Sequence, residues 1–133
     1  MIPDFDEQGY LPAGVHPASL DEIEARFGRQ SEVRQVQMES LRWLVELARK
    51  AGVQRLIING SFVTERLEPN DIDCVLLIGP DFSRDKGADR EILGGLPFLE
   101  IALIGQEDFD YLVDTVFATD RQRIPKGVVE VVL

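Results

Sequence analysis

The chain has 133 residues, of which 44% are apolar and 29% are charged, and its formal net charge at pH 7 is −10. This composition is that of a soluble globular protein, and the length is enough for one core but too short for two ordinary domains. The excess of acidic residues disfavours double-stranded DNA as a main partner, because proteins that bind it rely on a basic surface.

Nothing in the sequence predicts secretion or insertion into a membrane. No apolar stretch approaches the ~20 residues that a membrane span needs, and the N-terminus lacks the basic and apolar regions of a signal peptide. The single cysteine, Cys74, has no partner for an intrachain disulfide. We therefore expect a cytoplasmic protein that makes no membrane contact.

Residues 1–18 are predicted to form an irregular arm, because three prolines and two glycines interrupt them. Apolar side chains such as Phe5 and Tyr10 are expected to pack this arm along the remaining domain, residues 19–133, or against a second subunit. Residues 1–25 also contain six acidic residues and no Lys or Arg. This acidic stretch is expected to be a solvated surface, the alternative being a contact with a basic partner.

Residues 19–133 are predicted to form a single α/β domain of the α+β kind. Ser19 and Glu22 fit a capping box at the start of a short helix, and Ser31 is the expected start of a longer amphipathic helix that leaves Arg34 outside its apolar face. Short apolar runs bounded by turn residues then predict strands. The expected ranges are helices at 19–27, 31–50 and 109–118 and strands at 55–59, 72–78, 97–104 and 128–133. Residues 81–95 are expected to form a mobile polar loop beside the functional site, with room for one helical turn. This order predicts a mixed sheet covered by helices.

Two aspartates at the start of one predicted strand indicate a metal site. Successive side chains of a strand point to opposite faces, so Asp71 and Asp73 project the same way, roughly 6.5 to 7 Å apart along the strand. Two neighbouring carboxylates repel each other unless a cation lies between them or one takes a proton. Gly60 and Ser61 follow the preceding strand, and such a turn allows a phosphate to approach the backbone closely.

A third acid, Glu100, lies inside the apolar strand predicted at 97–104. In that strand Glu100 shares a face with Phe98 and Ala102, and Leu99 and Ile101 point to the other face. An acid in such a strand normally has a function or a partner, because burying an unpaired charge is costly. The alternative for all three acids is structural: they cap strands or meet Arg side chains.

Taken in order, Gly60-Ser61, Asp71-Ile72-Asp73 and Leu99-Glu100-Ile101 resemble the three-part signature of the polymerase-beta-type nucleotidyltransferase superfamily. The resemblance covers roughly residues 54–104, and by size it points to the minimal nucleotidyltransferases of bacterial toxin–antitoxin and defence systems. It implies a minimal nucleotidyltransferase fold for residues 19–133 and transfer of a nucleoside monophosphate from a nucleoside triphosphate. It further implies catalytic, metal-ligating roles for Asp71, Asp73 and Glu100, with Mg²⁺ or Mn²⁺ as the ion, and contacts to the triphosphate from Gly60, Ser61, Thr64 and Arg66.

The sequence departs from the minimal enzymes at one point, because Phe62 to Glu65 replace the Arg of their Gly-Ser-x-Ala-Arg-Gly pattern. Arg66, Arg84 and Lys86 are the nearby cations. Two functions therefore stay open: an active nucleotidyltransferase with a protein, RNA or small-molecule acceptor, and a nucleotidyltransferase-like binding module such as an antitoxin or assembly subunit. Candidate partners are a nucleoside triphosphate, a cognate toxin or antitoxin protein, and a second copy of the chain.

Overall fold

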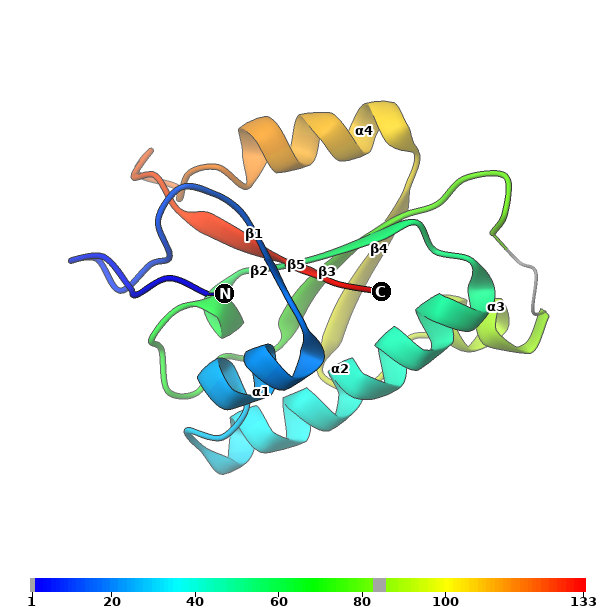
Figure 1. Cartoon of the computed structure of the whole chain (residues 1–133), viewed down its shortest axis with the longest axis horizontal. Coiled ribbons are helices and arrows are strands. Elements are labelled where there is room, and N and C mark those ends of the chain that lie inside the picture. Colours follow the sequence, from blue (N-terminus) through cyan, green and yellow to red (C-terminus); the bar gives the residue numbers. More distant parts are fainter. Residues whose placement is uncertain (1, 83–85) are drawn as a thin grey trace.

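A mixed five-stranded sheet forms the centre of the molecule, with helices on both of its faces (Figure 1). The structure is a computed structural model that describes residues 2–82 and 86–133. The strand order is β1-β5-β2-β3-β4, in which the β1–β5 and β3–β4 pairs are parallel and β2 runs antiparallel to both of its neighbours. The strands are β1 Gly14–Ala18, β2 Arg55–Asn59, β3 Ile72–Leu77, β4 Leu99–Ile104 and β5 Gly127–Val131. The predicted fold class, a mixed sheet with flanking helices, is confirmed.

Three helices, α1 (Leu20–Phe27), α2 (Glu32–Ala51) and α3 (Lys86–Leu93), lie on one face of the sheet (Figure 1). Ser19 caps α1 through the predicted capping box, and Ser31 accepts a hydrogen bond from the third residue of α2. The apolar stripes of these helices bury the larger core against the sheet. Its fully buried members include Ile23, Leu41, Leu44, Leu56, Ile58, Ile72 and Leu76.

The other face is covered by α4 (Gln106–Tyr111), which continues as a π-helical turn over Leu112–Val116. A smaller core forms here around Phe109, which is fully buried. The sequence predicted one helix at 109–118, whereas residues 112–116 form a π turn in which Val116 is 46% exposed. This cover packs against Ile57 and Val75, which are paired across β2 and β3. The next pair on the same face is Asn59 and Asp73, at the end of the sheet where β2 ends and β3 begins.

The N-terminal segment was predicted to be irregular up to residue 18, and this is wrong for its last five residues. Gly14 to Ala18 form β1, a parallel edge strand that pairs with β5. Proline is tolerated there, because an edge strand has one side without ladder bonds and Pro17 needs no N–H on that side. The preceding residues pack along the domain: Leu11 is fully buried, and the rings of Phe5 and Phe27 lie 6.1 Å apart.

The polar stretch at 81–95 was predicted to be a mobile loop beside the functional site, but much of it forms α3. This helix packs against α2, on the face of the sheet opposite to Asp73. Its buried residues Ala88 and Ile92 are four positions apart and form a stripe on a mostly polar helix. None of the helices in the described part of the chain has the length and apolar character of a membrane span.

Candidate functional site

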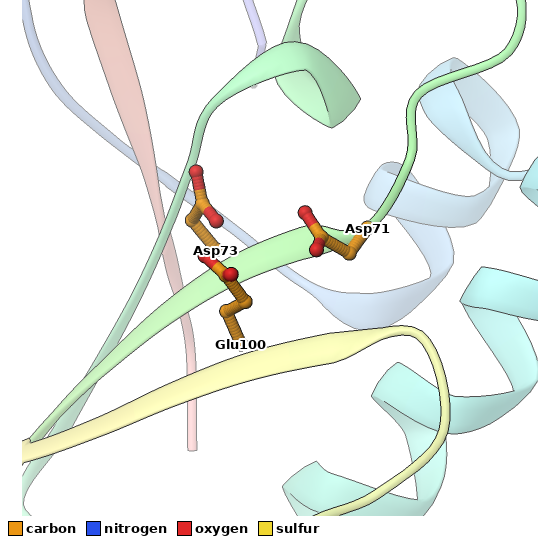
Figure 2. A group of neighbouring side chains, drawn as sticks. All are labelled: Asp71, Asp73 and Glu100. Carbon is orange, nitrogen blue, oxygen red and sulfur yellow. The ribbon is translucent and has the colours of Figure 1, made fainter.

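Asp71, Asp73 and Glu100 meet at the end of the sheet where β3 and β4 begin (Figure 2). Asp73 and Glu100 are paired in the parallel β3–β4 register, so their side chains project from the same face. Figure 2 shows Glu100 directed from β4 toward Asp73, with Asp71 just before β3. Each residue offers a carboxylate oxygen, and these three oxygens lie within 4.8 Å of one another. The cluster can bind a metal ion.

The electrostatics of the cluster favour a cation. Partial burial, a hydrogen bond with Glu100 and the charges of Glu100 and Asp71 raise the pKa of Asp73 to about 6. The pKa of Asp71 is also raised, by burial and then by the charge of Glu100. Both shifts mean that the ionised carboxylates are disfavoured, first by burial and then by the neighbouring negative charges, and a bound divalent cation would favour the ionised forms.

The Gly60 turn lies directly against this cluster. Gly60 has φ 82°, and a Cβ atom built on it would collide with Oδ2 of Asp73. The positive φ favours glycine at this position, and a Cβ atom would force the Asp73 carboxylate to move. Strand β2 therefore ends beside Asp73, and the chain turns at once into the 3₁₀ turn Ser61–Val63.

Arg34 of α2 fixes the loop that follows this turn. Its side chain is 2% exposed and donates hydrogen bonds to backbone carbonyls of Phe62 at 2.7 Å and Thr64 at 2.9 Å, as well as to those of Ser61, Arg66 and Phe27. Burial lowers the pKa of Arg34 to about 10. The guanidinium group is thus held by carbonyl dipoles within the loop.

The sequence pattern placed Arg34 outside the apolar face of its helix, and this was wrong. Arg34 lies four residues before Met38 and seven before Leu41, which are both buried. That spacing puts the three side chains on one stripe of the helix. Val36, on another side of the same helix, is 43% exposed although it is apolar.

A pocket of about 390 Å³ lies beside the Gly60 turn and contains all four residues predicted to contact the triphosphate. The N-terminal arm closes one side of it: Tyr10 forms a bridge with Thr64, and its hydroxyl donates to Oδ2 of Asp120 at 2.9 Å. The Thr64 hydroxyl itself donates to the Ser61 carbonyl. The pocket is lined by Gln8, Gly9, Tyr10, Leu11, Asn59, Gly60, Ser61, Val63, Thr64, Glu65, Arg66, Asp120, Lys126 and Gly127.

Of the three cations predicted near the site, Arg66 is the one whose side chain lies within the described part of the chain. Arg66 is exposed and lines the rim of the pocket. Arg84 lies outside the described residues, and so does the side chain of Lys86. A second hollow of about 540 Å³ follows β3 and β4 from Asp73 and Glu100 to Phe117. The acid cluster therefore lies next to two spaces, one on the side of the Gly60 turn and one on the side of β4.

Two side chains of the site were not singled out from the sequence. Lys126 was treated only as part of the turn before the last strand, yet it lines the pocket and its charge acts on both Asp73 and Asp120. Asn59 is 4% exposed, and its Oδ1 has no hydrogen-bond partner among the described residues. A polar residue that ends an apolar strand just before Gly60 is a signal that could have identified Asn59.

With this geometry established, the chain was compared with known proteins. Residues 3–132 match the model of the DUF6932 family, which is described as a family of unknown function. The chain belongs to the DUF6932 family. The match includes the arm, the Gly60 turn, the three acids and the last strand, so these features all lie within the region that defines the DUF6932 family. The comparisons with curated proteins and with solved structures found no match.

Proposed function

We propose that this chain is a metal-dependent nucleotidyltransferase-like protein that transfers a nucleoside monophosphate from a nucleoside triphosphate to a hydroxyl group of a protein, RNA or small-molecule acceptor. The observation that carries the proposal is the contact between the Gly60 turn and the acid cluster, which is so close that a Cβ atom on Gly60 would displace the Asp73 carboxylate. A turn that admits phosphate and a cluster that attracts a divalent cation are thereby adjacent.

The donor set fits Mg²⁺ or Mn²⁺, because these hard cations prefer oxygen ligands and Asp71, Asp73 and Glu100 supply three carboxylates. Once bound, the ion would neutralise phosphate charge and stabilise the charge that develops during transfer. Gly60 and Ser61 would hold the triphosphate in the pocket on the β2 side. Thr64 would shape that pocket through its bond to Ser61, and Arg66 would meet the phosphates from the rim.

The acceptor would enter from the β4 side, because Glu100 is exposed there and lines the second hollow with Phe117. The acceptor oxygen would form a bond to the α-phosphorus while the bond from that phosphorus to the bridging oxygen breaks. Pyrophosphate leaves, and the hydroxyl proton of the acceptor passes to solvent.

A second candidate function, a binding module that keeps the fold, is favoured by a separate observation. The loop lacks the Arg of the minimal enzymes, and the guanidinium of Arg34 is occupied by loop carbonyls. Glu65 and Asp120 also add negative charge to the pocket. In this alternative the chain binds a cognate toxin or antitoxin protein, or another copy of itself, without turnover.

Radiolabelled ATP, GTP, CTP and UTP separate the two candidates. Each is incubated with the protein, Mg²⁺ or Mn²⁺ and the protein encoded by the neighbouring gene, with Asp71→Asn/Asp73→Asn as the control. Label on the acceptor that is absent with the control supports the transferase. If no label is transferred and both proteins form the same complex, the binding module is correct and the transferase is wrong.

A further inference from the structure

Lys126 is held in a fixed position at the wall of the pocket beside the Gly60 turn. Its backbone N–H donates to the carbonyl of Ala118 at 2.9 Å, and the N–H of the next residue, Gly127, donates to that of Leu11 at 2.9 Å. The antiparallel β2–β5 register, with Ile58 opposite Val129, brings the start of β5 to the end of β2. The fold therefore places this lysine beside Gly60 from a position 66 residues later in the chain.

The charge of Lys126 acts on Asp73 and Asp120 without a direct ion pair to either carboxylate. No ion pair between Lys126 and any described residue is formed, although its side chain is partly buried. The carboxylate of Asp120 is already occupied: Oδ1 accepts from the amides of Gln122 and Ile124, and Oδ2 accepts from Tyr10. A partly desolvated cation without an ion pair is unfavourable, and an anionic ligand would offset that cost.

Asn59 provides an independent sign that this pocket takes a polar ligand. It lines the same pocket, it is 4% exposed, and its Oδ1 has no partner among the described residues. It is also the cross-strand neighbour of Asp73. A buried amide oxygen without a hydrogen bond is rare in proteins. Rotation of the amide would present its NH₂ group instead, so the same side chain can bind a phosphate oxygen.

Neither of the two arginines near the turn offers a partly buried charge that is free to bind an anion inside the pocket. Arg34 donates to five backbone carbonyls and is enclosed behind the loop. Arg66 is exposed at the rim, where solvent screens its charge. Lys126 also lines the pocket, but it is partly buried and forms no ion pair with the described part of the chain.

We propose that Lys126, assisted by Asn59, binds the terminal phosphates of the nucleoside triphosphate and supplies the positive charge that the Gly60–Glu65 loop lacks. The inference rests on the proposed function and assigns one of its binding subsites. Its chemistry is that of a polyphosphate anion, so inorganic tripolyphosphate is a suitable probe alongside ATP.

Isothermal titration calorimetry on the full chain tests this subsite. ATP and tripolyphosphate, each with Mg²⁺, are titrated into the wild type, Lys126→Met, Lys126→Arg and the control Lys50→Met, which removes an exposed lysine on α2 with the same change in net charge. We expect Lys126→Met to weaken both ligands by about tenfold, as loss of one charge-assisted contact does. Lys126→Arg should retain most of the affinity, and Lys50→Met should match the wild type.

Mn²⁺ titration without nucleotide separates this inference from the proposed function. Lys126→Met should bind Mn²⁺ as tightly as the wild type or more tightly, because a positive charge near Asp73 has been removed. If the wild type binds metal and ATP but Lys126→Met binds ATP and tripolyphosphate equally well, the subsite is wrong and the proposed function stands. If the wild type binds neither metal nor ATP, both are wrong. Melting curves establish that each variant is folded, and Lys126→Gln replaces Lys126→Met if the latter does not fold.

Discussion

At the scale of single residues, the site combines groups that are unfavourable in the metal-free protein. Asp71 and Asp73 have raised pKa values, Asn59 has an unpaired buried oxygen, and Gly60 adopts a left-handed backbone. Each of these groups lowers the stability of the fold, and each would be relieved or used by a bound cation and phosphate. Substitutions of these groups should therefore change the stability of the fold and the affinity for cation or phosphate in different ways.

Asp73→Asn should stabilise the metal-free protein in a pH-dependent way. The folded-state pKa of Asp73, about 6, is above its ordinary value, so between about pH 4 and pH 6 the native state keeps a proton that the unfolded chain releases. Stability of the wild type should therefore fall through this window relative to that of the variant. Thermal melts in EDTA should show the smallest difference at about pH 4 and the largest above pH 6. Equal melting temperatures at every pH would contradict the raised pKa of Asp73 and with it the cost of burying this carboxylate beside Glu100.

The same variant should lose the stabilisation that metal gives to the wild type at neutral pH. Millimolar Mg²⁺ or Mn²⁺ should raise the melting temperature of the wild type, because binding to the native state alone stabilises it. Asp73→Asn removes one of three ligands and the charge that attracts the ion. An equal shift in both proteins would mean that the metal binds elsewhere.

Two glycine substitutions separate backbone strain from contact with the acid cluster. Gly60 and Gly95 have nearly the same φ, 82° and 84°, but a Cβ on Gly95 meets nothing within 4 Å, whereas one on Gly60 meets Asp73. Alanine at either position should cost about 1 kcal/mol or more for its left-handed backbone. Only Gly60→Ala should also abolish the metal-dependent rise in melting temperature. Retention of that rise in Gly60→Ala would show that the close approach to Asp73 is unimportant.

At the scale of secondary-structure elements, the loop after Gly60 takes its shape from α2. Arg34 donates hydrogen bonds to the backbone carbonyls of Phe62, Thr64 and Arg66. Residues close in the sequence would not supply donors for these carbonyls. Arg34→Met should therefore strand several buried carbonyls and destabilise the fold by about 3 kcal/mol. Chemical denaturation measures this loss. Arg42→Met, which removes an arginine that pairs with Asp21 and Glu24 on the surface, is the control and should cost less than about 1 kcal/mol.

Arg34→Lys tests whether the geometry of the guanidinium group or only its positive charge is needed at this position. An ammonium group has no planar fork of five donors, so it cannot serve the same carbonyls from one position. We expect little recovery of stability and weaker ATP binding, because the wall of the pocket loses its fixed shape. Full recovery by lysine would mean that positive charge alone matters at this position.

Elements defined by local patterns were predictable from the sequence, and those defined by distant partners were not. Capping residues and periodicity identified α1 and α2, whereas the pairing of Asp73 with Glu100 comes from the β3–β4 register. Strand β1 was missed because its ladder is made with β5, more than 100 residues later. Helix α3 was expected as no more than a helical turn within a loop, because its short apolar stripe is stabilised by docking on α2.

The residues of the candidate site also fall into two groups, those that a local pattern could predict and those that depend on distant partners. Gly60 and the three acids lie within one segment of the chain, so their order was informative. Lys126 reaches the pocket through strand pairing, and Tyr10 reaches it through the packing of the arm. The burial of Arg34 was not predicted, because a charged residue on a buried stripe of a helix is rare unless specific hydrogen-bond acceptors surround it. These contacts depend on tertiary structure, which no local pattern encodes.

At the scale of the whole molecule, the two ends of the chain meet around the pocket. The Tyr10 hydroxyl donates to Asp120, the Glu65 N–H donates to the Gly9 carbonyl, and the Gly127 N–H donates to the Leu11 carbonyl. These contacts join the arm to the Gly60 loop and to the start of β5. Opening of the arm would therefore disturb both walls of the pocket together.

Tyr10→Phe tests this coupling, because it removes one side-chain hydrogen bond and leaves the ring in place. The lost bond contributes about 1 kcal/mol, so the arm should open roughly five times more often. Hydrogen exchange should then be faster at the Glu65 and Gly127 amides, whereas amides of β2 and β3 should keep their rates, since their ladder bonds do not involve the arm. Tyr111→Phe, on an exposed residue of α4, is the matched control and should leave all of these rates unchanged. If the nucleotide occupies the pocket behind the arm, ATP with Mg²⁺ should slow exchange at the Glu65 and Gly127 amides in the wild type. Faster exchange limited to Glu65 would mean that the arm contacts the two walls independently.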